Sequence, residues 1–157
     1  MQIRPGFSYH IKNSFFDFVQ DNALMSNKEN GHFRPHFLAI QDDFDENIYW
    51  MIPISSKVDK YQTIMSKKQA KYGKCDTIVI GKFAGEDRAF LIQNAFPIIP
   101  EYFDHIHTIN DIPVTIHQTL QAELETKLKK IIAMNKNGVP LFFSNVNHIM
   151  EILKKTN

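Results

Sequence analysis

The segment Pro53-Ile54-Ser55-Ser56-Lys57 places two hydroxyl groups beside a primary amine, at the point where an apolar run ends. Hydroxyl and ammonium groups held together can bind a phosphate and stabilise negative charge that develops on it during a reaction. A serine can also act as a nucleophile that a neighbouring lysine activates. The same residues suit a structural role, in which Ser55 or Ser56 caps the next helix and Lys57 is solvated. The residue types alone leave these alternatives open.

A lysine-rich stretch begins at this motif. The range Lys57–Lys74 contains six lysines and one acid, Asp59, with Tyr61 and Tyr72 interleaved. This pattern suits a polyanion, because ammonium groups bind phosphates and aromatic rings stack on bases. An ordinary solvated helix face has a similar composition, so the residues alone leave both interpretations open.

Histidines are the remaining candidates for acid–base or metal chemistry. Seven are scattered along the chain: His10, His32, His36, His105, His107, His117 and His148. A metal site needs three or four convergent ligands, and no HExxH motif occurs, so we expect no metal. A histidine can still move a proton near neutral pH. The chain also lacks phosphate-loop, GxGxxG and GxSxG motifs, so we expect no cofactor.

The composition is that of one folded domain spanning residues 1–157. The chain is 43% hydrophobic and 22% charged with a net charge of +1, and its 12% aromatic content excludes intrinsic disorder. No run approaches the roughly 20 apolar residues of a membrane span, and the start lacks the features of a secretory signal. The single cysteine, Cys75, cannot form an internal disulfide. These features together predict a cytoplasmic protein.

The middle of the chain is predicted to form strands. Five short apolar runs are bounded by turn residues: His36–Ile40, Ile48–Ile52, Thr77–Ile80, Ala89–Ile92 and Phe96–Pro100. The first two are joined by an acidic loop and the second is closed by Pro53, which predicts an antiparallel hairpin. The third and fourth runs repeat the pattern, and the prolines of the fifth suit a sheet edge. This spacing is typical of a small, strongly curved sheet or barrel.

The C-terminal third is predicted to be helical. One apolar stripe recurs at steps of four and three: Ile116, Leu120, Leu124, Leu128 and Ile131. Gly138 and Pro140 end this long helix. Shorter helices are expected at Ser14–Val19, Tyr61–Ala70 and Val146–Lys154. The elements predict an α+β fold, with helices packed on a compact, curved antiparallel β-barrel core.

At this level of detail the sequence resembles a known family. The stretch Tyr49–Lys57, preceded by His36–Ile40, is similar to the ToxN/AbiQ toxins of type III toxin–antitoxin systems. The stretches Tyr72–Gly85 and Arg88–Asn94 resemble the CptN/TenpN branch in particular. The resemblance extends from about Phe7 to the last helix. It implies an SH3-like barrel related to MazF/Kid toxins, and an endoribonuclease activity.

The resemblance also implies a partner. Toxins of this family process, and are inhibited by, their own RNA antitoxin, a tandem-repeat RNA whose repeats fold as pseudoknots. Toxin and RNA alternate in a closed ring, and related systems abort phage infection. For this chain the resemblance therefore implies cellular RNA as substrate, an RNA antitoxin as inhibitor, and neither DNA nor membrane as partner.

The resemblance also assigns functional residues of the family to matching positions of this chain. The hydroxyl pair and lysine of the family fall on Ser55, Ser56 and Lys57, which are the candidate catalytic residues. Other family members carry threonine first and one residue before the lysine, and this chain has neither. A family tyrosine falls on Tyr9 or His10, and a basic position falls near Arg34 or His36. With the lysine-rich stretch, these positions give the candidate RNA contacts: His10, Arg34, His36, Lys60, Tyr61, Lys67 and Lys68.

The mechanism implied is metal-independent. The RNA 2′-hydroxyl attacks its own adjacent phosphate, giving a 2′,3′-cyclic phosphate and a 5′-hydroxyl, while Lys57 and the serines stabilise the added charge. DNA lacks the 2′-hydroxyl and cannot react. Two alternatives stay open at this stage. One is a MazF-like RNase restrained by a protein antitoxin, and the other is a non-catalytic RNA-binding barrel.

Overall fold

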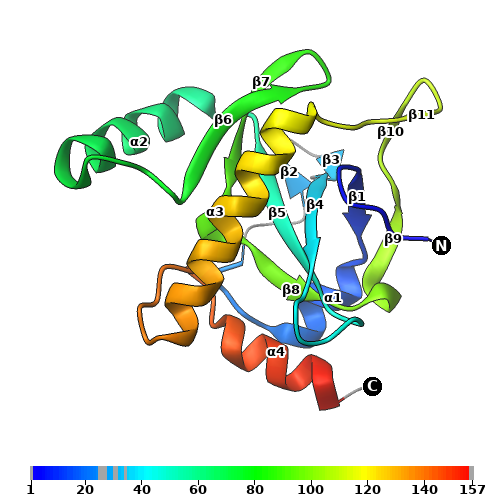
Figure 1. The fold of residues 1–157 in the computed structure, drawn as a ribbon. Coiled ribbons are helices and arrows are strands. Elements are labelled where there is room, and N and C mark those ends of the chain that lie inside the picture. The colour runs from blue at the N-terminus through cyan, green and yellow to red at the C-terminus, as the bar shows by residue number, and fades with distance from the viewer. Residues whose placement is uncertain (1, 25–27, 30–31, 34, 156–157) are drawn as a thin grey trace.

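The computed structural model describes residues 2–24, 28–29, 32–33 and 35–155 (Figure 1). The candidate Arg34 therefore lies outside the described residues. The helices and 3₁₀ helices are α1 (Asn13–Val19), α2 (Val58–Tyr72), η1 (Ile92–Asn94), η2 (Pro100–Tyr102), α3 (Gln118–Lys136) and α4 (Val146–Lys155). The strands are β1 (Ser8–Ile11), β2 (Lys28–Glu29), β3 (His32–Phe33), β4 (His36–Gln41), β5 (Tyr49–Ser55), β6 (Ile78–Phe83), β7 (Glu86–Leu91), β8 (Phe96–Ile98), β9 (Phe103–Ile106), β10 (Thr108–Ile109) and β11 (Ile112–Pro113).

A curled antiparallel sheet forms the centre of the fold. Within the described residues it has seven strands in the order β6-β7-β5-β4-β1-β9, and β8 pairs with β5 alone. The β4–β5 and β6–β7 hairpins confirm the pairings expected from the sequence, and β8 confirms the expected edge position. The result is an α+β half-barrel with helices packed on it, as the sequence predicted.

Strand β5 continues past Pro53, where the sequence predicted its end. Pro53 pairs with His36 of β4, and the strand runs on to Ser55. On its other edge β5 pairs with β8 up to Met51 and with β7 from Ile54. Pro53 thus lies between two partner strands, where a missing N–H donor is tolerated. The first serine of the motif therefore belongs to the sheet.

Helix α3 covers one face of the curled sheet (Figure 1). Its stripe of Leu124, Leu128 and Ile131 is fully buried, which confirms the predicted apolar face. Ile116 lies before the helix, which begins at Gln118. Close packing is possible because Gly81 of β6 has no side chain. A Cβ there would lie 2.7 Å from Leu120 Cδ2.

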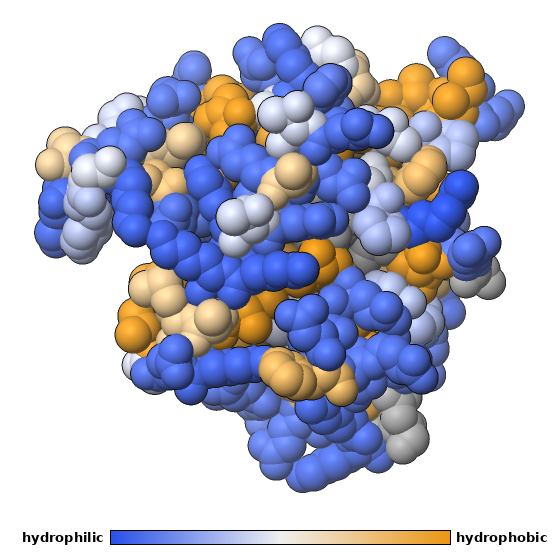
Figure 2. Space-filling model, in the orientation of Figure 1, coloured by the Kyte–Doolittle hydropathy of each residue, from blue (hydrophilic) through white to orange (hydrophobic). Residues whose placement is uncertain are grey.

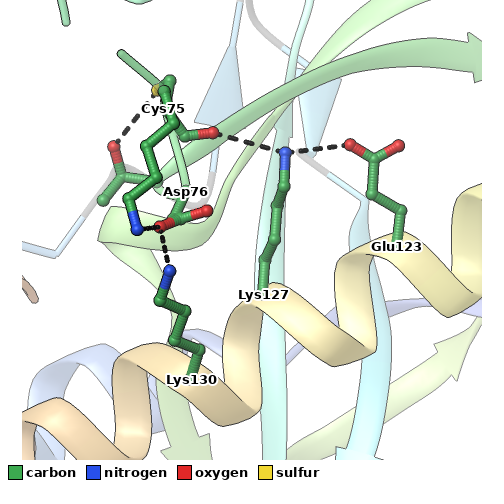
Figure 3. A network of polar contacts seen from close by, with 7 residues as sticks. Cys75, Asp76, Glu123, Lys127 and Lys130 are labelled. Atoms are coloured by element: carbon green, nitrogen blue, oxygen red, sulfur yellow. Dashed lines mark hydrogen bonds and ion pairs between the residues drawn. The ribbon is translucent and has the colours of Figure 1, made fainter. Parts of the chain in front are cut away.

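An ion pair and a hydrogen bond attach α3 to the segment before β6 (Figure 3). Lys127 Nζ donates to the Cys75 carbonyl (3.3 Å) and to Glu123 (2.9 Å). Lys130 Nζ donates to Asp76 Oδ2 (2.7 Å). The hydrogen bond from Lys130 lowers the pKa of the Asp76 carboxyl below its usual value, since it stabilises the charged form. The single cysteine is buried in this region.

The opposite face packs against α1 and α4. This second core is rich in aromatic rings, with Phe15 stacked on Phe96 at 5.2 Å between ring centroids. Ile149 and Leu153 of α4 are fully buried in it. Within the described residues, no helix is both long and apolar enough to cross a bilayer.

Candidate functional site

Two serines and a lysine form the turn between β5 and α2, and we call these three residues the Ser-Ser-Lys turn. Ser55 is 1% exposed, while Ser56 and Lys57 are exposed. The Lys57 backbone N–H donates to Ser55 Oγ (3.2 Å), and the Val58 N–H donates to the Ser56 carbonyl (2.9 Å). These bonds fix the backbone from which Ser56 and Lys57 project.

Helix α2 begins immediately after this turn. Its N-cap residue is Lys57, whose own side chain makes no capping hydrogen bond. The alternative in which Ser55 or Ser56 is the capping residue is therefore wrong. The Lys57 side chain forms no hydrogen bond or ion pair with any residue that the structure describes. The amine is thus available to an anion, at a helix end where the helix dipole also favours negative charge.

The lysines of α2 divide into two groups. Lys67 is exposed, and Lys60 lies over the Tyr61 ring at 5.3 Å from its centroid. Lys68 is half-buried, and its Nζ donates to Thr77 Oγ1 (2.8 Å) and Gln93 Oε1 (3.1 Å). The viewed surface over α2, at the upper left of Figure 2, is mainly hydrophilic.

Tyr61 is less accessible than the sequence suggests. It is 7% exposed, because its ring packs in a small core with Ile78, Ala89 and Leu91 under α2. Its remaining exposed part lines a cavity of about 210 Å³ beside α2. Lys60 and Lys68 line the same cavity.

The other walls of this cavity come from parts of the chain that sequence reasoning missed. They are Gln93 and Asn94 of η1, and Phe143 in the 139–145 loop. No sequence pattern marks these three residues as part of a site. Gln93 and Asn94 are two amides after a strand, and Phe143 is one phenylalanine in a loop near the C-terminus. Only the tertiary fold brings them to α2.

A histidine cluster forms where β1 pairs with β9. His10 and His105 lie directly opposite each other, with their rings stacked at 4.3 Å between centroids. A hydrogen bond joins His10 Nε2 to His107 Nδ1 (2.8 Å). His105 Nδ1 in turn contacts Asp104 Oδ2 (3.1 Å). The period-two spacing of His105 and His107 was the only sequence signal for this cluster.

Burial and the neighbouring imidazoles lower the pKa of His10 from 6.5 to about 4. Burial, followed by His105, also lowers the pKa of His107. A neutral imidazole can accept a proton, so His10 has the ionisation state of a base at neutral pH.

His36 lies in the interior. It is 0% exposed and faces the rings of Phe16 and Phe96, at 6.5 and 5.6 Å between centroids. It therefore has no surface to offer to a macromolecule in this arrangement. Within the described residues, no three histidine, cysteine or acidic side chains converge so as to hold a metal ion.

Comparison with known proteins identifies the fold. No family model and no curated protein matches the sequence. Solved structures do match, over nearly the whole chain. One is AbiQ, a lactococcal anti-phage endoribonuclease of a type III toxin–antitoxin system, with a TM-score of 0.72 and 10% identity, covering 96% of each chain.

Two further structures match equally well. The first belongs to a bacterial antiviral system regulated by a processed non-coding RNA, with a TM-score of 0.71 and 10% identity, covering 94% of this chain and 97% of that one. The second belongs to bacterial type III toxin–antitoxin systems with selective toxin inhibition by a non-coding RNA pseudoknot. Its TM-score is 0.69 at 13% identity, covering 98% of each chain. The fold-level resemblance to ToxN/AbiQ toxins is confirmed, and the CptN/TenpN assignment stays a prediction.

Proposed function

We propose that this chain is a sequence-specific endoribonuclease toxin of a type III toxin–antitoxin system. The observation that carries the proposal is the full-length likeness of its fold to AbiQ and to a toxin inhibited by an RNA pseudoknot. The exposed Ser56 and Lys57, at the start of a lysine-rich helix, supply chemistry that agrees with it. Ser56 and Lys57 are the proposed catalytic residues, and Ser55 is the proposed positioning residue beside them.

The proposed reaction uses the substrate's own nucleophile. The ribose 2′-oxygen forms a bond to phosphorus, and the bond from phosphorus to the 5′-oxygen breaks. The 2′-hydroxyl loses its proton, and the leaving 5′-oxygen gains one. The products are a 2′,3′-cyclic phosphate and a 5′-hydroxyl, and the reaction consumes neither water nor cofactor.

The Ser-Ser-Lys turn would act on the charge of the transition state. The pentavalent phosphorus carries extra charge on its non-bridging oxygens, and the Lys57 ammonium and Ser56 hydroxyl can donate to them. Ser55 is buried and accepts from the Lys57 backbone, so its contribution is to hold the turn in position. The neutral His10 is a candidate to accept the 2′-hydroxyl proton.

The proposed partner is an RNA antitoxin. By analogy with the regulated relatives, a tandem-repeat pseudoknot RNA would be cut by this chain and would then occupy its active site. Toxin and RNA would alternate in a closed ring in the cytoplasm, and release of the toxin during phage infection would stop growth. The accessible contacts proposed for RNA are Lys60, Lys67 and the half-buried His10. Tyr61 and Lys68 line the cavity, where Tyr61 is mostly covered and Lys68 is held by Thr77 and Gln93.

A cleavage assay with two lysine variants tests the function. Purified protein is incubated with a defined single-stranded RNA in excess EDTA, and the new ends are identified chemically. We expect cyclic phosphate and 5′-hydroxyl ends from the wild type. Lys57→Ala should cleave about 10²–10³ times more slowly, since one donor to the transition state is lost. Lys129→Ala removes an exposed lysine on α3 and is the matched control.

Four results would contradict the proposal. Loss of cleavage in EDTA would indicate a metal-dependent enzyme. An active Lys57→Ala variant would remove the proposed catalytic residue. RNA that is bound but never cut would favour a non-catalytic binding protein. An inhibitory complex that survives RNase treatment would indicate a protein antitoxin of the MazF kind.

A further inference from the structure

Besides Tyr61 and Ile64 of α2, three kinds of group line the cavity beside this helix. Two lysines, Lys60 and Lys68, stand on one side, and an amide pair, Gln93 and Asn94, stands on another. Phe143 forms a third wall and is 59% exposed, which is unusual for a phenylalanine. Cations, amides and an exposed aromatic ring are the groups that bind the phosphate, the edge and the face of a nucleotide.

Hydrogen bonds hold these walls in fixed positions. The Gln93 N–H donates to the Thr77 carbonyl (3.0 Å), and the Phe143 N–H donates to the Gln93 carbonyl (2.9 Å). Lys68 Nζ bridges Thr77 Oγ1 and Gln93 Oε1. The helix, η1 and the 139–145 loop are therefore linked through one residue, Gln93. A cavity fixed in this way loses little entropy when it binds a ligand.

Asn94 offers an unused hydrogen-bonding group at the cavity. The residue is 6% exposed, and its Oδ1 is buried with no hydrogen-bond partner among the described residues. An unpaired buried amide oxygen is unfavourable unless a ligand or water satisfies it. The buried oxygen faces the cavity only after the amide turns, and the turned amide can pair with the edge of a base through its oxygen or its nitrogen.

The cavity also has a suitable size. A volume of about 210 Å³ equals about seven liquid water molecules at roughly 30 Å³ each. Drug-sized ligands occupy pockets of roughly 300–1,000 Å³. The cavity therefore suits a single heterocyclic base rather than a larger ligand.

Its position connects it to the Ser-Ser-Lys turn. Lys60 lies three residues after Lys57, and one turn of helix rises only about 5.4 Å. An RNA strand with one phosphate at Lys57 therefore has a neighbouring nucleotide within reach of the cavity.

We propose that this cavity binds one unpaired RNA base next to the cleaved phosphate and so sets the sequence that the chain recognises. Phe143 stacks on the base, Asn94 pairs with its edge, and Lys60 contacts the adjoining phosphate. Lys68 acts through Gln93 and is a positioning residue. This inference rests on RNA being the ligand, as proposed above, and adds the subsite that discriminates between bases.

Binding to non-reactive RNA tests the inference without depending on catalysis. The probes are fluorescent 2′-O-methyl hexanucleotides that each differ in one base, because a 2′-O-methyl group prevents the attack. We expect the wild type to prefer one base at one position. Phe143→Ala should weaken that preferred probe about 5- to 150-fold, since one stacking contact is lost. Phe44→Ala is the matched control, because it removes a 79% exposed ring from outside the cavity.

A second variant tests the edge contact. Asn94→Asp keeps the shape of the side chain but removes its donor, so the order of preference among the four bases should change. Melting curves establish that each variant is folded. Equal binding of all probes by the wild type would overturn the inference, as would unchanged affinity and base preference in both variants.

The result separates the two proposals. If the wild type cuts RNA and both variants keep its cleavage sequence, the base pocket is refuted while the RNase function stands. If the wild type discriminates bases through Phe143 and Asn94 but cuts nothing, the pocket stands while the catalytic proposal fails.

Discussion

The histidine cluster makes the stability of this chain depend on pH in a defined direction. The pKa of His10 falls from 6.5 to about 4 because folding partly buries the ring beside His105 and His107. A lowered histidine pKa means that the unfolded chain binds the proton more readily. The part of the unfolding free energy that depends on a neutral His10 is fully present above pH 6.5. It is lost as the pH falls from 6.5 to 4.

The size of the effect follows from the two pKa values. A pKa of about 4 in place of 6.5 corresponds to about 3.4 kcal/mol of unfolding free energy at low pH. The ring is only half-buried, so solvent screening reduces this to about 1–2 kcal/mol. His107, whose pKa is also lowered, acts in the same direction.

Urea unfolding between pH 7.5 and pH 4 measures this directly. We expect the wild type to lose unfolding free energy over this range, and His10→Gln to lose about 1–2 kcal/mol less. His148→Gln removes an exposed histidine outside the cluster and should follow the wild type. Parallel curves for His10→Gln and the wild type would refute the role of His10.

Two further predictions concern the attachment of α3. Asp76→Asn should lower the melting temperature by at most about 2–4 °C at pH 7. The difference should shrink as the pH falls below 3.8 toward the lowered pKa of Asp76, where the carboxyl that pairs with Lys130 becomes protonated; a difference that does not shrink below pH 3.8 would contradict this. Gly81→Ala should destabilise by at most about 1–3 kcal/mol, because the new Cβ would lie 2.7 Å from Leu120 Cδ2, at the end of a half-buried side chain that can shift. Adding Leu120→Ala should cost less than the sum of the two changes in urea unfolding, and strict additivity would contradict the clash.

Local sequence patterns predicted the parts of the fold that depend on neighbouring residues. The β4–β5 and β6–β7 hairpins join segments that are adjacent in the chain, so apolar runs and turn residues suffice to indicate them. The stripe Leu124–Leu128–Ile131 likewise follows from helical periodicity alone. The hydrophobic faces then determine on which side each element packs.

Long-range pairing could not be predicted in the same way. Strand β1 is four residues long, and its partner β9 lies more than ninety residues away. Neither has a hairpin signal, so the cluster of His10, His105 and His107 was not foreseen. The sequence predicts that β5 ends at Pro53, because a sequence does not show that two partner strands meet there.

In the candidate site, too, the sequence predicted the local features and missed those that depend on tertiary structure. The residue types of the Ser-Ser-Lys turn indicated its chemistry, and the fold places the turn at the end of a central strand. Burial is a tertiary property, so the sequence could not show that His36 is enclosed or that Tyr61 is mostly covered. Asn94 and Phe143 reach the cavity beside α2 only through the arrangement of η1 and the 139–145 loop.

The most direct test is a crystal structure of the wild type bound to an RNA whose scissile 2′-hydroxyl is replaced by hydrogen. Catalysis at the Ser-Ser-Lys turn requires a phosphate within about 2.7–3.2 Å of Lys57 Nζ or Ser56 Oγ, beside the missing 2′-hydroxyl. An RNA bound on another face of the molecule, with its scissile phosphate distant from Lys57, would contradict the assignment of catalysis to this turn.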